Sequence, residues 1–442
     1  MKLPSLPSVP GLASLGSIAY AAEYWLAPER FYARTTTLGD RFLFNLPGAV
    51  DGFCLTNPED IKQVYAASNE VLQLVPAMDR FTPHHAIFGE NTLVGVEGAE
   101  HLKQRRIVSP PFHARALSNY EAAMVRLTEK ALEDWPMGEE VSFRDRSGPI
   151  AFDIVAEVVF GITDELRAKR LLEAGTAWLE SIRSTRLMVQ TAWATARGGK
   201  WTGNYDAITT ARLRVEGLVQ EEIDNRRRTG DDGHRDVLGI MLSVRDDEGE
   251  PLSDLALRES IASLLIAGYE TTGQALSWLG NEITRQPEVL EQLTESAQGE
   301  DTSWLDAAVY EVLRLHPPVP FNARYVAAPF AFDDGTELEP GRIIMPFTYA
   351  LHRRPDLYPD PNMFAPQRFV GNRPKTNEWI PFGGGSRYCL GGQFALMEVR
   401  VILQTILRHA RFRVATTPLE PSTRMNISLV PKQGGRVTLD RA

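Results

Sequence analysis

The sequence predicts a mainly α-helical fold with small β-sheets, an α+β class. Three observations predict it. Apolar residues recur at helical spacing through most of the middle of the chain, including one long run at 253–286. Strand-like runs fall near both ends, in about 30–60, 320–350 and 415–442. No internal repeat divides the chain, so we expect residues 1–442 to form one domain in which both ends share the β-rich part.

Composition excludes several classes of protein. The 442 residues are 43% hydrophobic and 24% charged, a globular balance that permits a large core. The net charge of −10 disfavours nucleic acid as a partner. Two cysteines, Cys54 and Cys389, cannot form a disulfide framework, which fits a reducing cytoplasm.

The N-terminal segment does not meet the requirements of a membrane anchor. The apolar run from Leu12 to Ala22 is shorter than the roughly 20 residues that span a bilayer. A single Lys2 precedes it, which is a poor signal-peptide pattern. We therefore expect no integral membrane anchor; a peripheral membrane contact by this segment is the alternative.

The first third of the chain begins with a hairpin. Strand-like runs at 41–45 and 52–55 flank a Pro-Gly turn, and Asn57 with Pro58 then predicts a helix start. Residues 71–97 lack periodicity and contain prolines and glycines, so we expect a long loop, which is often functional. A helical pattern from 97 to about 135 is broken at Pro110-Pro111.

The centre is expected to be helical. Helices are predicted over 150–195 and 205–227, with a loop at 197–203 and a charged loop at 226–235. The run 253–286 has a cap at Ser253 or Asp254, ends at Pro287, and would be about 50 Å long. Its stretch from Ile261 to Ala267 is apolar all round, which predicts a helix buried through the centre.

The last third mixes short elements. Helices are predicted at about 288–297 and 302–315, and proline clusters at 355–366 indicate an irregular segment. Strand-like runs lie near 323–333, 341–346 and 425–439.

One stretch carries reactive chemistry, Phe382-Gly-Gly-Gly-Ser-Arg-Tyr-Cys-Leu-Gly-Gly392. A helical pattern follows from Phe394, so Cys389 lies where a glycine-rich loop enters a helix N-terminus. Unpaired N–H groups and the helix dipole there favour a thiolate. Such a thiolate is a nucleophile, a redox thiol or a metal ligand.

The buried helix breaks its own pattern at Ala267-Gly-Tyr-Glu-Thr-Thr272. Gly268 costs about 1 kcal/mol in a helix interior relative to alanine. Glu270 places a charge in an apolar region, and Thr271 can donate to the Ala267 carbonyl and open the helix locally. Local rule-breaking of this kind is typical of functional sites.

The loop pattern Phe382-x-x-Gly385-x-Arg387-x-Cys389-x-Gly391 resembles the haem-binding loop of the cytochrome P450 family. Three further motifs resemble that family in the same order: Ala267-Gly-x-Glu-Thr, Glu311-x-x-Arg314 and Phe364-x-Pro-x-Arg368-Phe. The resemblance covers about residue 30 to the end. It implies the P450 fold, a long central helix over haem b, and Cys389 as the axial thiolate of the iron.

The resemblance also assigns roles. It implies Glu270 and Thr271 as the catalytic pair that handles oxygen and protons, and Ala267 beside the haem. It implies haem-propionate contacts from His101, Arg105, Arg324 and Arg387. Glu311, Arg314 and Arg368 are implied as a buried structural network that holds the Cys389 loop.

The implied activity is monooxygenation, which inserts one oxygen atom of O2 into an apolar substrate such as a fatty acid, terpenoid, steroid or macrolide-like molecule. Electrons would come from a separate ferredoxin or flavodoxin with its reductase, because 442 residues leave no room for a reductase domain. Lys103 and Arg106 are expected on that docking surface. We expect a cytoplasmic monomer.

The substrate pocket is expected from the family pattern at Phe81, Phe88, Leu264, Ala267, Val319, Phe321 and Ile427. Arg80, Arg183 or Arg186 is expected to bind a substrate carboxylate if there is one. Two other activities stay open: a peroxide-dependent haem-thiolate hydroxylase, against which Glu270 and Thr271 argue, and a non-catalytic haem-thiolate ligand sensor.

Overall fold

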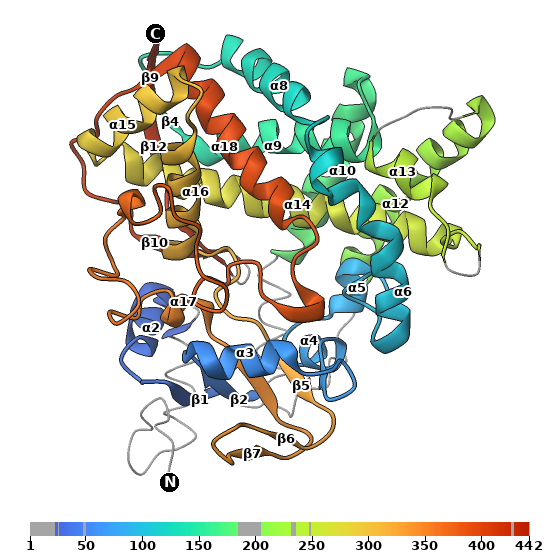
Figure 1. The fold of residues 1–442 in the computed structure, drawn as a ribbon. Coiled ribbons are helices and arrows are strands. Elements are labelled where there is room, and N and C mark those ends of the chain that lie inside the picture. The colour runs from blue at the N-terminus through green and yellow to red at the C-terminus, as the bar shows by residue number, and fades with distance from the viewer. Residues whose placement is uncertain are drawn as a thin grey trace.

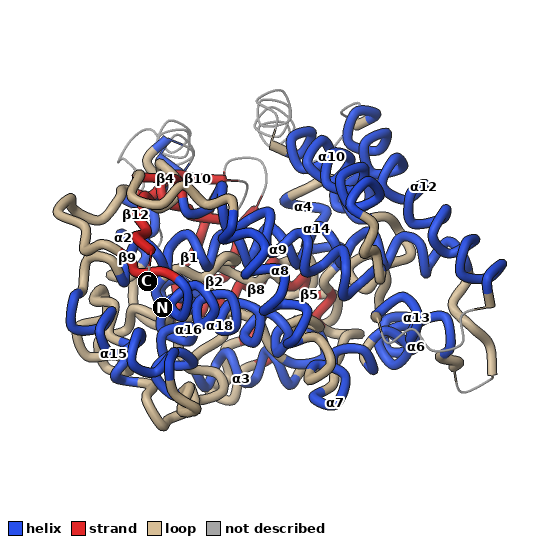
Figure 2. Tube along the Cα trace, turned by 90° about the horizontal axis from the view of Figure 1, so that it is seen from above, coloured by secondary structure: helices blue, strands red, loops and turns tan. Residues whose placement is uncertain are grey.

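The computed structural model describes residues 23–441, apart from 25, 47–49, 184–204, 231–235, 247–248 and 426–427. The N-terminal run Leu12–Ala22 and the predicted loop at 197–203 lie outside the described residues. Figure 1 shows the long helices in the upper part of the molecule and the largest sheet in the lower part. Viewed from above, helices make up most of the chain (Figure 2), as the sequence predicts.

The long central helix is α14, Asp254–Ile283, which confirms the prediction for 253–286. The Ser253 side chain caps it by accepting a hydrogen bond from the Ala256 N–H. Most of its middle is buried, including Ile261 and Leu265. It packs against helices and strands from distant parts of the chain: α9 (Phe143–Phe160), α12 (Asp206–Thr229), α16 (Ser303–Leu315), α18 (Gly392–His409), β11 (Ser428–Pro431) and β12 (Arg436–Arg441).

The largest sheet joins strands from both ends of the chain. Its order is β1-β2-β8-β5-β3, with β2 and β8 parallel and the other pairs antiparallel. The strands are β1 (Arg41–Leu46), β2 (Val50–Leu55), β8 (Ile343–Pro346), β5 (Arg324–Val326) and β3 (Leu72–Gln73). Because β2 pairs with β8 across about 290 residues, the N-terminal hairpin cannot form this sheet alone.

Three smaller sheets complete the β-structure that the described residues contain. One joins β4 (Glu140–Ser142), β12 and β9 (Ala410–Phe412), one pairs β10 (Ser422–Met425) with β11, and one pairs β6 (Phe330–Ala331) with β7 (Glu337–Leu338).

The remaining helices surround this frame. They are α2 (Pro28–Thr35), α3 (Pro58–Ala66), α4 (Val75–Phe81), α5 (His84–Phe88), α6 (Gly98–Val108), α7 (Ala114–Leu117), α8 (Glu121–Glu133), α10 (Glu165–Ile182), α13 (Val237–Ser243), α15 (Pro287–Gln298) and α17 (Thr348–Leu351), with 3₁₀ turns at Pro110–Phe112, Pro366–Arg368 and Gly385–Arg387. Asn57 caps α3 as predicted, accepting from the N–H groups of Glu59 and Asp60.

Several expectations were wrong in detail. The expected loop at 71–97 contains β3, α4 and α5, because helices of seven and five residues are too short to show a period. The charged segment expected to be a loop from 226 instead continues α12 to Thr229, since Arg226 is buried and paired with Asp236. The short elements β4, α13, α17 and β9 were not predicted.

Within the described part of the chain, no helix combines the length and the apolar character needed to cross a bilayer.

The contact between α14 and α9 is tight enough to be tested by one methyl group. A Cβ on Gly280 would lie 2.7 Å from the Phe143 ring, whereas a Cβ on Gly217 in α12 would meet nothing within 4 Å. We predict that Gly280→Ala lowers the free energy of unfolding by about 1–3 kcal/mol through overpacking. Gly217→Ala should raise it by about 0.5–1 kcal/mol through helix propensity. Urea unfolding measures both; equal effects would contradict the packing described.

Candidate active site

Cys389 lies on a loop that turns back on itself directly before α18. The Cys389 N–H donates to the Phe382 carbonyl (2.9 Å), and the Gly392 N–H donates to the Cys389 carbonyl (3.3 Å). Because α18 begins at Gly392, the thiol sits at a helix N-terminus, as the sequence predicts.

Two glycines let this loop lie directly on α3. A methyl group on Gly384 would overlap the Tyr65 ring, and one on Gly385 would overlap the Tyr65 carbonyl oxygen. Gly385 also has φ +65°, a conformation that residues with a Cβ rarely adopt. Only glycine therefore permits this contact, which fixes the loop that carries the thiol.

Two arginines hold the loop from the side of α6. Arg105 of α6 donates to the Tyr388 carbonyl (2.7 Å), next to Cys389. Arg387 of the loop donates to carbonyls in the segment before α6 and pairs with a carboxylate there; its partners are Leu93 (2.5 Å), Val96 (2.7 Å) and Glu97. The loop is thus attached to α3 and to α6.

The environment of the Cys389 thiol differs from the expectation of a favoured thiolate. The side chain is accessible, yet dense surrounding protein raises the pKa of the thiol by desolvation. The Gly391 N–H and the charge of Arg105 lower this pKa, as the helix N-terminus predicts, but the effect of burial is larger. Coordination to a metal ion deprotonates a thiol outright, so the accessible Cys389 sulfur suits a metal ligand.

A cluster of positive charge lies beside the loop. The charges of Arg387, Arg105 and Arg324 all act on His101, and together with burial, which is the largest cause, they lower its pKa to about 3. Arg387 pairs with Glu97, whereas Arg105 and Arg324 donate to uncharged carbonyl oxygens. The cluster therefore carries more positive than negative charge.

Unused hydrogen-bonding groups remain in this cluster. His101 Nδ1 and Arg387 Nε are buried without a hydrogen-bond partner. Buried polar groups are nearly always paired, and arginine suits carboxylates because of its planar fork. The residues present therefore fit a ligand that carries carboxylates near an accessible thiol, as haem b does with its two propionates.

The face of α14 around Ala267 is accessible although most of the helix is buried. Ala267 is exposed, and Leu264, Gly268 and Thr271 are half-buried, whereas residues 272–284 are all buried. These positions are three and four residues apart, so they form one stripe along the helix. An accessible stripe in the middle of a core helix marks a surface that protein side chains do not cover.

The acid and alcohol of this stretch each have defined partners. Thr271 Oγ1 donates to the Ala267 carbonyl at 2.7 Å, which confirms the predicted bond. The α-helix is nevertheless continuous from Asp254 to Ile283, so the expected local opening does not interrupt it. Glu270 pairs with Arg183 at the end of α10 (2.7 Å) and accepts from Gln274 (3.4 Å).

The structure brings Glu311, Arg314 and Arg368 together. Arg314 makes two bonds to Glu311 (2.7 and 2.8 Å), and both side chains are fully buried. Arg368 Nε donates to Glu311 Oε1 (3.0 Å), as does the Ala365 N–H (2.8 Å). Arg314 also donates to the His352 carbonyl at the end of α17 and to the Pro361 and Met363 carbonyls of the irregular segment.

The residues expected in the substrate pocket fall into two groups. Phe81 and Phe321 lie 5.8 Å apart between ring centroids, in the cluster beside the large sheet. Phe88 and Leu264 pack instead against the helical core. Val319 is half-buried before β5, and Ile427 lies outside the described residues.

Of the arginines expected to bind a carboxylate, Arg183 is paired with Glu270, whereas Arg80 is exposed. Arg186 lies outside the described residues.

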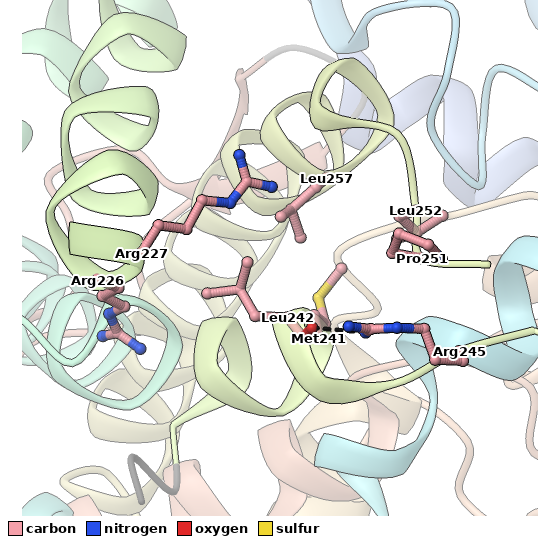
Figure 3. Close-up of a pocket in the computed structure, with 8 residues that line it drawn as sticks. All are labelled: Arg226, Arg227, Met241, Leu242, Arg245, Pro251, Leu252 and Leu257. Carbon is pink, nitrogen blue, oxygen red and sulfur yellow. Dashed lines mark hydrogen bonds between the residues drawn. The ribbon is translucent and has the colours of Figure 1, made fainter. Parts of the chain in front are cut away.

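A pocket of about 290 Å³ lies elsewhere, between α12, α13 and the start of α14 (Figure 3). Its arginines are already engaged: Arg226 with Asp236, Arg227 with Asp254, and Arg245 with the Leu242 carbonyl. Its wall residue Leu257 precedes Ala267 by ten residues, about 15 Å along the helix. This pocket is therefore separate from the Ala267 stripe.

Sequence reasoning missed Glu398 of α18. This side chain is fully buried, and Thr272, the neighbour of Thr271, donates to its Oε2 at 2.8 Å. Its Oε1 has no partner, and burial raises its pKa to about 8. The signal available in the sequence was a glutamate on the apolar face of the helix pattern that follows Cys389, between Phe394 and Ile402.

Comparisons with known proteins identify the family to which the chain belongs. The fold, the accessible cysteine and the basic cluster fit a haem-thiolate protein. A family model described as Cytochrome P450 matches residues 35–439. The chain therefore belongs to the cytochrome P450 family, uses haem b, and is a P450 monooxygenase.

Two mycobacterial relatives carry provisional P450 names. Cytochrome P450 137 of Mycobacterium tuberculosis is 30% identical over 436 residues, which are 98% of this chain and 90% of its own. Cytochrome P450 138 of Mycobacterium bovis is 30% identical over 396 residues, 88% and 86% of the two chains.

A solved structure shares the fold. It is a cyanobacterial CYP120A1 with bound retinoic acid, with a TM-score of 0.78 and 24% identity, and the match covers 95% of this chain and 96% of that one. At this identity the likeness shows the fold alone, and it confirms the P450 fold that the sequence predicts.

The raised pKa of Glu398 predicts how stability depends on pH. Its carboxyl keeps its proton up to about pH 8 in the folded chain but loses it near its ordinary value of 4.5 when unfolded. Stability should therefore fall as pH rises from about 4.5 to 8, by at most about 5 kcal/mol. Glu398→Gln, which still accepts from Thr272, should remove this dependence.

Urea unfolding of haem-loaded wild type and Glu398→Gln at pH 5, 7 and 9 measures the effect. The variant's advantage should grow with pH. A difference that stays constant from pH 5 to 9 would show that Glu398 is ionised in the folded protein.

Proposed function

We propose that this protein inserts one oxygen atom of O2 into an apolar organic acid or a similar apolar molecule, with electrons from a separate redox partner. The observation that carries the proposal is the accessible stripe of α14, where Ala267 is exposed and Thr271 is half-buried on a helix that is otherwise largely core. An accessible surface in the middle of a core helix suits the binding of a small reactant, and Thr271 places a hydroxyl group on that surface.

Haem b would be held by the groups around the Cys389 loop. We assign Cys389 as the iron ligand, Ala267 as a residue beside the haem, and His101, Arg105, Arg324 and Arg387 as propionate contacts. The unpartnered His101 Nδ1 and the excess positive charge support the last assignment. When bound, haem with a thiolate ligand supplies oxygen activation and favours O–O cleavage.

Thr271 and Glu270 would deliver protons to the reacting oxygen. A hydroxyl both donates and accepts, so Thr271 can turn from the Ala267 carbonyl toward a reactant. Glu270 is held by Arg183, whose side chain is about one-third exposed and therefore reaches solvent. This pair supports a path for protons from the surface through Glu270 to Thr271.

An apolar substrate is supported by the aromatic character of the expected wall, Phe81, Phe88 and Phe321. Arg183 is occupied by Glu270, so Arg80, at the end of α4 beside Phe81, is the arginine we assign to a substrate carboxylate. CYP120A1 binds retinoic acid, which is an apolar acid of this class.

The redox partner is proposed to be a ferredoxin or flavodoxin with its reductase. Arg105 links α6 to the Cys389 loop, so exposed positive groups on α6 are near the thiolate side. Lys103 is exposed although it pairs with the buried Asp246 carboxylate (2.7 Å), and Arg106 is also exposed. We further propose a monomer, and a location in the cytoplasm, where a reducing environment suits the two free cysteines.

The test is turnover with NADPH, a surrogate ferredoxin and its reductase, on a panel of long-chain fatty acids and retinoids. We predict oxygenated product from wild type. Thr271→Ala should consume NADPH but lose product by about 100-fold, because proton delivery contributes about 10²–10⁴. Thr271→Ser, which keeps the hydroxyl, is the matched control. Product formed only with added peroxide, or equal coupling in Thr271→Ala, would contradict the proposal.

A further inference from the structure

Three metal-ligating side chains meet where α4 ends and α5 begins. Asp79 lies in the last turn of α4, and His84 and His85 open α5. One donor atom from each lies within 4.8 Å of the others. Asp79 Oδ1 is 3.1 Å from His84 Nδ1, and the two imidazole rings are 3.8 Å apart between centroids. We propose that this trio binds a divalent transition-metal ion of the zinc type.

The unused nitrogens of the two histidines point to a ligand. His84 is fully buried, and its Nε2 makes no hydrogen bond, while its Nδ1 faces Asp79 Oδ1 at 3.1 Å; His85 Nδ1 is likewise buried without a partner. Leaving a buried polar group unpaired costs about 1–3 kcal/mol, so these two atoms beside one carboxylate point to an occupant. An ion that accepts one lone pair from each imidazole would partner one nitrogen of each ring.

Each histidine can give an ion one nitrogen, because a neutral imidazole keeps one lone pair for coordination.

The donor set selects the class of ion. Two imidazoles with one carboxylate suit zinc, nickel, copper or iron, whereas calcium and magnesium prefer oxygen ligands alone. Around tetrahedral zinc, ligand atoms lie about 3.4 Å apart. The Asp79 side chain is about half exposed and can turn to reach that spacing. Three protein ligands leave a fourth position for water or another donor.

The position of the trio gives the ion a structural effect. Glu97 accepts from the N–H groups of Leu74 and Val75 at the start of α4 and pairs with Arg387 of the Cys389 loop. At the other end, α5 packs against α12 and α14. An ion at Asp79, His84 and His85 would lock the α4–α5 junction between these two anchors.

Metal binding is measured by calorimetric titration of Zn²⁺ into the haem-loaded full chain without a histidine tag. Wild type should bind one equivalent. His84→Ala and Asp79→Asn should bind about 100-fold more weakly, because loss of a ligand exceeds the 10–100-fold cost of losing its supporting group. His113→Ala, at an exposed histidine outside the trio, should bind like wild type.

Zinc-edge X-ray absorption on the loaded wild type provides a second readout that needs no variant. Two imidazole ligands and oxygen at about 2.0–2.2 Å would support the site. Weak binding of several ions that is unchanged in His84→Ala would overturn the proposal. So would a zinc shell that contains sulfur or fewer than two imidazoles.

Discussion

The contact between Tyr65 and Gly385 fixes the loop on which the chemistry depends. The loop carries the Cys389 thiol, and its backbone lies against the Tyr65 carbonyl where a methyl group would overlap. Arg105 and Arg387 hold the same loop from α6 and the segment before it. The thiol is therefore positioned mainly by contacts to the backbone of its loop, and its side chain stays accessible.

Burial affects ionisable side chains in two different ways in this molecule. At Glu311 and Arg314, charges are fully buried but meet each other and several carbonyls, so the cost of desolvation is met by direct bonds. At His101 and Glu398, burial instead shifts the pKa values, to about 3 and about 8, and leaves one polar atom of each unpaired. Such unpaired atoms lie near the Cys389 loop and the Thr271 stretch, where function is expected.

The sequence predicted the features that follow from a long helical repeat of apolar residues or from a specific motif. The helix α14, the bond from Thr271 to Ala267 and the Glu311–Arg314 pair all follow from spacing within one helix. The pairs of Glu270 with Arg183 and of Thr272 with Glu398 join different helices, so no local pattern contains them. The helices α4 and α5 are too short for their apolar residues to show a helical repeat, so the sequence did not predict them. The cluster around His84 was missed for the same reason.

The central claim is that Cys389 is the thiolate ligand of a haem iron, and the absorption spectrum of the reduced, CO-bound protein tests it most directly. Cys54 is the matched control, since it is the other free cysteine and is buried. We predict that wild type and Cys54→Ala show the long-wavelength band of a thiolate-ligated haem and that Cys389→Ala loses it. Purified protein without porphyrin, or a Cys389→Ala spectrum identical to wild type, would contradict the account.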